Sequence, residues 1–224
     1  MTFSIVGHCP KTGQFGMAVT SSSPAVAARC AYARAGVGAV ASQNVTDPRL
    51  GPRTLEAMAG GMDAEAAVAH VMSGADHRDY RQVLAVDAEG RTAIFSGAST
   101  LGINAEYASQ HAAAAGNLLD NTTIPEAMVT AFHETNGHLG DRLIAAMQAG
   151  LHAGGEAGDI HSAGMLLVDR HDWPLAELRC DWTEDCPIAA ITAAWDVYKP
   201  QMDDYVTRAL NPASAPSYGV PGDL

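Results

Sequence analysis

MTFSIVG opens the chain at residues 1–7, and its residues 2–7 have the composition of a β-strand that begins at the chain terminus. The tripeptide KTG at 11–13 is a tight-turn signal, and QFGMAVTS at 14–21 reads as a returning strand. Together these segments predict a β-hairpin. Because the first strand is short, apolar and followed at once by its partner, we expect it at the centre of a sheet.

Groups of strands and pairs of helices follow this hairpin along the chain. Helices are indicated where Pro stands near the start of a segment and Gly just past its end. The predicted elements are a strand at 36–44, helices at 51–61 and 63–74, a hairpin over 80–97 that turns at DAEG, a strand at 107–119, helices at 124–137 and 139–155, a hairpin of 162–170 and 174–182, and a helix at 187–210 interrupted at Pro200.

This order predicts an α+β fold, a four-layer αββα sandwich in which two mainly antiparallel sheets pack face to face with helices outside. Neither a repeat nor a linker divides the chain. We therefore expect a single domain over residues 1–210 and an irregular, Pro-rich tail over residues 211–224.

Composition excludes several classes of function. The 224 residues carry a formal net charge of −12, and an acidic surface repels nucleic-acid phosphates. Without a basic cluster, binding to an anionic membrane is not expected, and without an apolar window of the required length a transmembrane span is not expected either. The chain opens without signal-peptide features, and its four cysteines form no CxxC pair, so we expect a reduced cytoplasmic protein.

The sequence lacks the usual motifs for cofactors and metals. The sequence has no GxGxxG or GxxxxGK[ST] segment that would cradle a nucleotide. In HETNGH, at 133–138, the second His follows the first by five positions, whereas two ligands on one helical face need a spacing of four. We therefore expect no cofactor and no metal site.

Thr2 is the first candidate catalytic residue. A small second residue permits removal of Met1, which would place a free α-amine beside the Thr2 hydroxyl. An α-amine titrates near pH 7.7–8.0 and can act as a base toward its own side chain, so one residue supplies both nucleophile and base. A small residue after Met1 is also common in cytosolic proteins. Ser4 lies on the same face of the strand and is explained better as a strand hydroxyl bonded to a neighbour than as a catalytic group.

Further polar candidates lie at the ends of apolar segments. Gln43 and Asn44 close the strand at 36–44, where their amides suit an oxyanion or a bound amide, or else a buried turn. Arg53 stands at a helix start, where a cation is electrostatically unfavourable. A bound substrate carboxylate, or Asp47 as an internal partner, would account for it. Asn117 ends AAAAGN, a small-residue segment that suggests the wall of a crevice.

Four blocks of this sequence are specific enough to suggest a family: MTFSIVG, GMAVTSSSPAVAA at 16–28, ARAGVGAVASQN at 33–44 and GPRTLEAM at 51–58. They resemble the DUF1028 family of uncharacterised, N-terminal-nucleophile-like proteins, and the resemblance continues in order to about residue 170. It implies an αββα sandwich like that of proteasome subunits, with a nucleophile at the start of the first strand. Ser21 stands at the family's serine position, although turn chemistry explains SSSPAV at 21–26 as well. The resemblance implies no established reaction.

Two functions remain open at this point, besides a third case in which the chain is a subunit that acts only within a larger assembly. In the first, the protein is an N-terminal-nucleophile amidohydrolase acting on a small amide or peptide-like molecule, with Thr2, Gln43 and Asn44 catalytic and Ser21, Arg53 and Asn117 binding the substrate. In the second, it is a non-catalytic small-molecule-binding or scaffold protein that keeps the same fold. In either case Ala-rich helices leave small-residue surfaces, and we expect a homodimer or a larger closed assembly.

Overall fold

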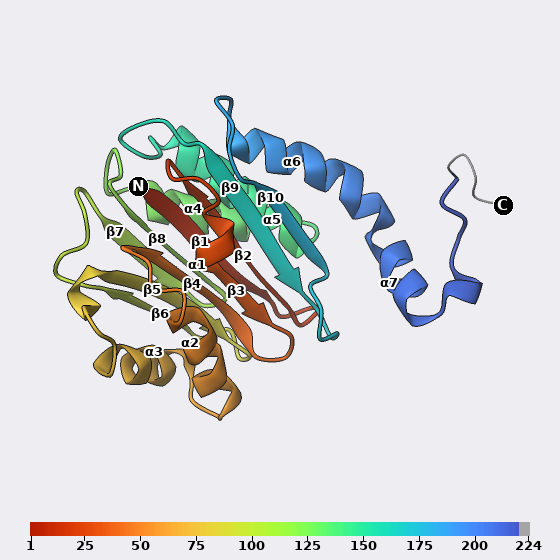
Figure 1. Ribbon diagram of the computed structural model, residues 1–224, viewed down its shortest axis with the longest axis horizontal. Coiled ribbons are helices and arrows are strands. Elements are labelled where there is room, and N and C mark those ends of the chain that lie inside the picture. The colour runs from red at the N-terminus through yellow and green to blue at the C-terminus, as the bar shows by residue number, and fades with distance from the viewer. Residues whose placement is uncertain (220–224) are drawn as a thin grey trace.

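The structure, a computed structural model, describes residues 1–219. Two antiparallel sheets pack face to face, and helices cover both outer faces (Figure 1). In the described residues the larger sheet has six strands, in the spatial order β10 (Ala176–Cys180), β9 (Ser162–Val168), β2 (Gln14–Ser21), β1 (Thr2–Cys9), β8 (Ala112–Asn117) and β7 (Ala105–Ser109). The smaller sheet has the order β3 (Ala31–Arg34), β4 (Gly38–Asn44), β5 (Arg81–Asp87) and β6 (Thr92–Ser96). This architecture confirms the predicted αββα sandwich.

Strand β1 is central, as its sequence predicts. It pairs along its length with β2 on one side and with β8 on the other. All eight of its residues are buried, because the second sheet covers one face and helices cover the other. This double burial explains why the strand is so apolar.

The helices form the two outer layers. Against the six-stranded sheet pack α4 (Ile124–Glu134), α5 (Leu139–His152) and α6 (Pro187–Tyr198). Against the four-stranded sheet pack α2 (Leu50–Ala59) and α3 (Ala64–Ser73). Helix α3 begins where predicted, since the Asp63 carboxylate accepts a hydrogen bond from the Ala66 N–H at 2.8 Å.

Alternation along β1 divides the core into layers. Phe3 and Ile5 pack with residues of α4 and α5, while Val6 packs with Leu84 and Val86 of the facing sheet. Even-numbered side chains of β1 therefore point between the sheets, and odd-numbered ones point toward the helices. A third cluster lies between the four-stranded sheet and α2 and α3.

Two segments differ from the sequence-based expectation. The single strand expected at 107–119 is a hairpin, in which β7 and β8 pair around a turn whose His111 has a φ of 71°. Residues 27–34, for which no element was predicted, form the short helix α1 (Ala27–Cys30) and the edge strand β3. The other predicted helices and hairpins are present, with ends shifted by a few residues.

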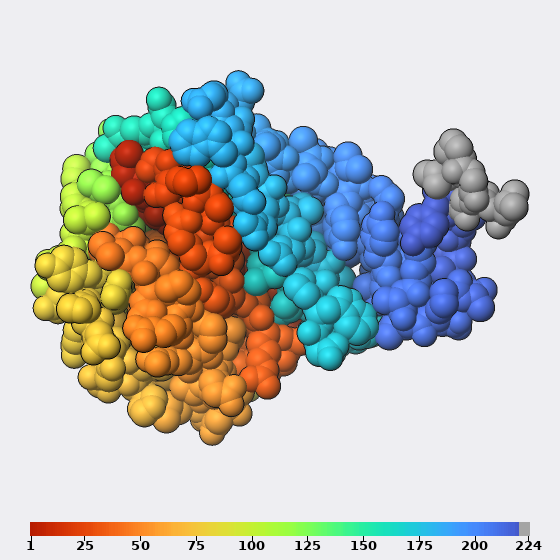
Figure 2. All heavy atoms as spheres, in the orientation of Figure 1, coloured from red at the N-terminus to blue at the C-terminus, as the bar shows by residue number. Residues whose placement is uncertain are grey.

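The C-terminal part of the chain extends away from the sandwich. As predicted, the last helix is interrupted around Pro200, where the 3₁₀ turn Lys199–Gln201 separates α6 from α7 (Met202–Leu210). Helix α7 projects to one side of the body (Figures 1 and 2). The predicted tail is described to residue 219 and includes the turn Pro212–Ser214; its residues 220–224 lie outside the described part. Within residues 1–219, no helix combines the length and apolarity needed to cross a bilayer.

Candidate active site

A row of polar side chains lies at one end of the layer between the sheets. Thr2 faces this layer, as Val6 does four residues later on the same strand. Ser21 of β2 and Asn117 of β8 are its direct cross-strand partners, and Ser162 of β9 is in turn opposite Ser21. Directly opposite residues share a face of the sheet. The structure therefore brings together three of the residues singled out in the sequence: Thr2, Ser21 and Asn117.

The facing sheet completes the row with two amides. Gln43 of β4 is paired in register with Gln82 of β5, and both are fully buried. Ser4 Oγ donates to Gln43 Oε1 at 2.6 Å, and Gln43 Nε2 donates to Gln82 Oε1 at 2.8 Å and to the Ala115 carbonyl at 3.1 Å. Asn117 Nδ2 also donates to Gln82 Oε1, at 3.3 Å. These bonds join the two sheets through one buried polar network.

The Thr2 hydroxyl has a second hydroxyl beside it. Its Oγ1 lies 3.2 Å from Ser21 Oγ, and the carbonyl oxygen of Met1 accepts hydrogen bonds from both. Ser21 Oγ also accepts from the Ser23 N–H at 3.1 Å. Thr2 is only 6% exposed. An amide carbonyl oxygen thus lies against both hydroxyls at the start of β1.

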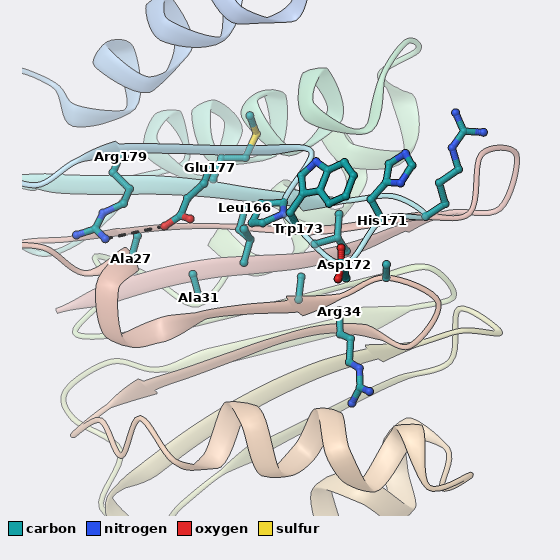
Figure 3. Close-up of a pocket in the computed structure, with 15 residues that line it drawn as sticks. Ala27, Ala31, Arg34, Leu166, His171, Asp172, Trp173, Glu177 and Arg179 are labelled. Atoms are coloured by element: carbon teal, nitrogen blue, oxygen red, sulfur yellow. Dashed lines mark ion pairs between the residues drawn. The ribbon is translucent and has the colours of Figure 1, made fainter. Parts of the chain in front are cut away.

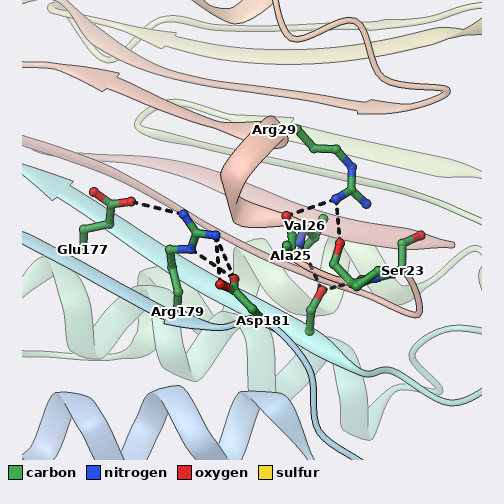
Figure 4. Close-up of polar contacts among 9 residues, drawn as sticks. Ser23, Ala25, Val26, Arg29, Glu177, Arg179 and Asp181 are labelled. Carbon is green, nitrogen blue, oxygen red and sulfur yellow. Dashed lines mark hydrogen bonds and ion pairs between the residues drawn. The ribbon is translucent and has the colours of Figure 1, made fainter.

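The loop that follows β2 is fixed by several bonds (Figure 4). Ser162 Oγ donates to the Ser23 carbonyl at 2.6 Å and accepts from the Val26 N–H at 3.2 Å. Arg29 donates to the Ala25 carbonyl at 3.0 Å. The SSSPAV segment therefore forms a bonded turn, and its first residue, Ser21, places a hydroxyl next to that of Thr2.

Glu156 is a buried acid that the sequence analysis missed. It is 6% exposed, its Oε2 accepts from the Ser22 N–H at 3.2 Å, and its Oε1 has no partner among the described residues. Burial raises the pKa of this carboxyl to about 8, against the opposing attraction of the terminal ammonium and the Ser22 hydrogen bond. In the sequence it stands in GGEAGD, at 154–159, which signals only a loop after a helix.

Asn44 lies at the rim of this region and is engaged by loops. Its φ of 69° ends β4, its Nδ2 donates to the Tyr80 carbonyl at 2.7 Å, and its Oδ1 accepts from the Leu101 N–H at 3.2 Å. These bonds fasten two loops, and none of them reaches Thr2.

Arg53 lies elsewhere, on the outer helical layer. It lines a hollow between α2 and α3, together with Glu56 and His70. Asp47, one of the two partners considered for Arg53, is bound by Arg49 instead, at 2.7 Å and 2.9 Å. Arg49 lowers the pKa of Asp47 to about 2.

A cavity of about 430 Å³ opens at a different edge of the sandwich, between β3 and the β9–β10 hairpin (Figure 3). Ala31 contributes to its apolar wall, and Trp173 at the hairpin tip stacks on His171 with ring centroids 4.5 Å apart. Arg179, which also lines it, is paired with Asp181 at 2.9 Å (Figure 4). None of the sequence-predicted site residues lines this cavity.

Comparison with known proteins places this architecture in a family. The model described as "Family of unknown function (DUF1028)" matches residues 2–191. This chain belongs to the DUF1028 family. The crystal structure of protein SPO2555 from Silicibacter pomeroyi, also assigned to DUF1028, is 32% identical, covers 88% of this chain and 89% of its own, and superposes with a TM-score of 0.82. Family membership thus confirms the DUF1028 part of the resemblance seen in the sequence.

A second solved structure is far more distant. Anbu (ancestral beta-subunit) from Yersinia bercovieri is 8% identical over 91% of this chain and 97% of its own, and its TM-score of 0.38 is too low to support an argument. No curated protein matches the sequence. Membership in DUF1028 therefore leaves the reaction open.

Proposed function

We propose that this protein is an N-terminal-nucleophile amidohydrolase that acts on a small amide or peptide-like substrate. The observation that carries the proposal is the position of Thr2. It is the first residue of the central strand, its hydroxyl lies 3.2 Å from Ser21 Oγ, and its cross-strand neighbour on the other side is Asn117. A hydroxyl at a chain terminus, held on a rigid strand among polar groups, has what a nucleophile with its own amine base needs.

The reaction begins after Met1 has been removed. The free α-amine of Thr2 takes the proton from Oγ1, which attacks the substrate carbonyl carbon. The tetrahedral intermediate collapses as the C–N bond breaks, and the ammonium returns the proton to the leaving nitrogen. Water, deprotonated by the same amine, then hydrolyses the ester formed on Thr2.

Ser21 and Asn117 are the proposed substrate contacts. Ser21 Oγ already donates to an amide carbonyl, that of Met1, and would make the same bond to a substrate oxygen. Gln43 was expected to hold the oxyanion, but its Nε2 is engaged by Gln82 and Ala115. In this proposal Gln43 instead supports the strand of Thr2 through Ser4. Asn44 and Arg53 have no role in the proposed reaction.

The same observations leave a second candidate, a non-catalytic binding or scaffold protein. It is favoured by the burial of Thr2 and by the internal bonding of the Gln43, Gln82 and Asn117 amides. A network of this kind can serve only to join the sheets. The experiment that separates the two candidates is therefore a test of Thr2 itself.

The mass of the purified protein is the first measurement, because retention of Met1 excludes the α-amine mechanism. The second is labelling with a panel of β-lactone and related electrophilic probes, followed by peptide mapping. We expect a label on Thr2 that is lost in Thr2→Ala and retained at a reduced rate in Thr2→Ser. Thr92→Ala, which removes a bonded strand hydroxyl on β6, should label like the wild type. Undiminished labelling of Thr2→Ala would refute the nucleophile and favour the scaffold.

A further inference from the structure

Met1 lies at the start of β1 in the position of an acyl group. Its carbonyl oxygen accepts hydrogen bonds from Thr2 Oγ1 and from Ser21 Oγ, the nucleophile and a substrate contact of the proposed function. This carbonyl belongs to the amide that joins Met1 to Thr2, so Met1 presents an amide carbonyl to both hydroxyls. The direction of its side chain therefore indicates where the acyl chain of a bound amide can extend.

The side chain of Met1 lies against Gly158. A Cβ on Gly158 would lie 3.1 Å from Met1 Cε and 3.7 Å from Met1 Sδ. Apart from the chain neighbours of Gly158, no other atom of the described residues lies within 4 Å of that Cβ position. Met1 thus fills a space beside Gly158 that no other side chain enters. Removal of Met1, which the proposed function requires, leaves this space to a ligand.

The loop that carries Gly158 is held in place from both neighbours of β1. The Ala157 N–H donates to the Leu118 carbonyl at 3.0 Å, just past the end of β8. On the other side Glu156 Oε2 accepts from the Ser22 N–H at 3.2 Å, just past the end of β2. Because β1 lies between β8 and β2, the loop crosses the end of β1 at which the chain begins.

The character of the Met1 side chain sets the kind of group that this space accepts. It is unbranched, flexible and uncharged. On the same loop, burial raises the pKa of Glu156 to about 8, so this carboxyl is neutral at neutral pH and does not oppose an apolar chain. Gly158 itself adds no side chain to narrow the space.

We propose that the space of the Met1 side chain is an acyl-chain site, and that the substrate is an amide of an unbranched, uncharged acyl group about as long as a methionyl group. The inference rests on the proposed function and adds the substrate class to it. The substrate carbonyl takes the place of the Met1 carbonyl beside Thr2 Oγ1 and Ser21 Oγ, and its chain lies against Gly158. Gly158 is then a specificity-determining residue.

The chain preference is tested with two β-lactones that carry either a butyl or a methyl group on the carbon next to the carbonyl. The butyl group matches the methionine side chain from Cβ to Cε, whereas the methyl group stops at Cβ. The rate at which each probe labels Thr2 is measured by intact mass and divided by its rate with N-acetylthreonine in solution. Burial of the additional methylenes should favour the butyl probe by about tenfold or more. Equal corrected rates overturn the inference.

Gly158→Leu should remove this preference, because the new side chain takes the space of the butyl group. The φ of Gly158 lies outside the left-handed region, so the backbone accepts a side chain. The ratio of butyl to methyl labelling should fall by about fivefold or more. Gly74→Leu is the control, because a Cβ there would meet no atom within 4 Å, and it should keep the wild-type ratio.

Gly158→Ala takes the place of the leucine variant if circular dichroism shows that Gly158→Leu does not fold. Its added methyl group would lie 3.1 Å from the position of Met1 Cε, so the ratio should fall by about twofold. An unchanged ratio in the variant that folds overturns the inference.

A second measurement needs no reaction. In Thr2→Ala the second residue is still small, so Met1 can be removed, and the glycine amides are labelled with ¹⁵N. Hexanamide, whose acyl chain is as long as a methionyl group, should shift the Gly158 resonance at a concentration at which acetamide does not. Equal effects of the two amides contradict the acyl-chain site.

The two proposals fail in distinguishable ways. A shift of the Gly158 resonance by hexanamide without probe labelling of Thr2 supports the acyl-chain site and contradicts the hydrolase. Labelling of Thr2 without a preference for the butyl group contradicts the acyl-chain site alone. Retention of Met1 contradicts both, because its side chain then keeps the space filled.

Discussion

Gln43 links the two sheets through a single side chain. Its Oε1 accepts from Ser4 on β1, and its Nε2 donates to Gln82 on β5 and to the Ala115 carbonyl on β8. A buried amide with partners on three strands fixes the distance and the register between the sheets, provided that every partner remains satisfied.

Gln43→Ala should therefore be costly for stability. The substitution leaves buried polar atoms of Ser4, Gln82 and Ala115 short of a partner, and each such loss costs about 1–3 kcal/mol. We expect the free energy of unfolding to fall by about 2–4 kcal/mol in urea titrations. Gln110→Ala, at the exposed β7–β8 turn, should change it by less than about 0.5 kcal/mol. Equal effects from the two variants would mean that the network does not join the sheets.

Glu156 gives the protein a specific pH dependence of stability. Its pKa is raised from 4.5 to about 8, so the folded protein binds this proton more tightly than the unfolded chain does. Stability from this group is complete below about pH 4.5 and is lost as the pH rises through about 8. Each unit of pKa corresponds to about 1.4 kcal/mol, and the carboxyl is nearly buried, so the loss should be measurable.

The measurement is the melting temperature of wild type and Glu156→Gln between pH 5 and pH 9. The neutral amide cannot ionise, so the stability of the variant relative to the wild type should increase with pH across this range. Two curves that run parallel would show that Glu156 does not ionise in this window.

Part of the candidate site could be predicted from the sequence. Period-2 alternation places Thr2 and Ser4 on one face, and the KTG turn of the first hairpin puts Ser21 close to Thr2. Two features were out of reach. The pairing of Asn117 with Thr2 depends on a register between distant strands, and the position of Glu156 depends on loop contacts that follow no periodic pattern.

At the scale of elements, a strand that is buried on both faces lacks the alternation of polar and apolar residues by which a strand is usually predicted. Ala112 to Ala115 are all fully buried, so β8 shows no polar alternation, and four consecutive alanines resemble a helix as much as a strand. The segment 27–34 is also Ala-rich, and its helix and strand have four residues each, too few for a periodic pattern. The hairpin over 80–97 was predicted correctly because its DAEG turn separates two strongly β-forming segments.

Glycines set how closely the helices approach the six-stranded sheet. Gly7 and Gly16 are directly opposite each other on β1 and β2. A Cβ on Gly16 would lie 2.5 Å from Leu167 Cδ2 and 2.8 Å from the Leu166 carbonyl oxygen, and a Cβ on Gly7 would lie 2.7 Å from the Phe132 ring. Small residues here let α4 and α5 pack directly on the central strands.

Gly16→Ala should accordingly loosen this layer. The backbone oxygen of Leu166 cannot move aside as a side chain can, so we expect a loss of about 1–3 kcal/mol in the free energy of unfolding. Gly74→Ala is the matched control, because its Cβ would meet no atom within 4 Å and its φ is −102°. The free energies of unfolding of both variants are compared by calorimetric melting. A Gly16→Ala variant as stable as the wild type would show that β9 can shift without a loss of stability.

At the scale of the whole molecule, two surfaces differ in character. The sandwich buries most of its apolar groups in three clusters and exposes others, such as Ile103 and Trp182, on separate loops, whereas the C-terminal arm, residues 197–219, carries several exposed ones on one projecting segment. On the arm, Val197 is 66% exposed, Leu210 58% and Tyr218 57%. The arm projects beyond the body (Figure 2), and the family match ends at residue 191, before it begins. Large apolar side chains gathered on a projecting element are typical of an interaction surface.

We expect this arm to carry the contact of the homodimer or larger assembly that the sequence analysis predicts. An aspartate at Val197 or Leu210 would have to be desolvated in such a contact, so the double variant Val197→Asp/Leu210→Asp should raise the dissociation constant at least about tenfold. Ile103→Asp introduces the same charge on a loop of the sandwich, at a side chain 48% exposed, and should leave assembly unchanged. Sedimentation velocity from about 1 to about 100 µM measures all three proteins. A wild type that remains monomeric throughout this range, or an equal effect of Ile103→Asp, would remove the arm as the site of assembly.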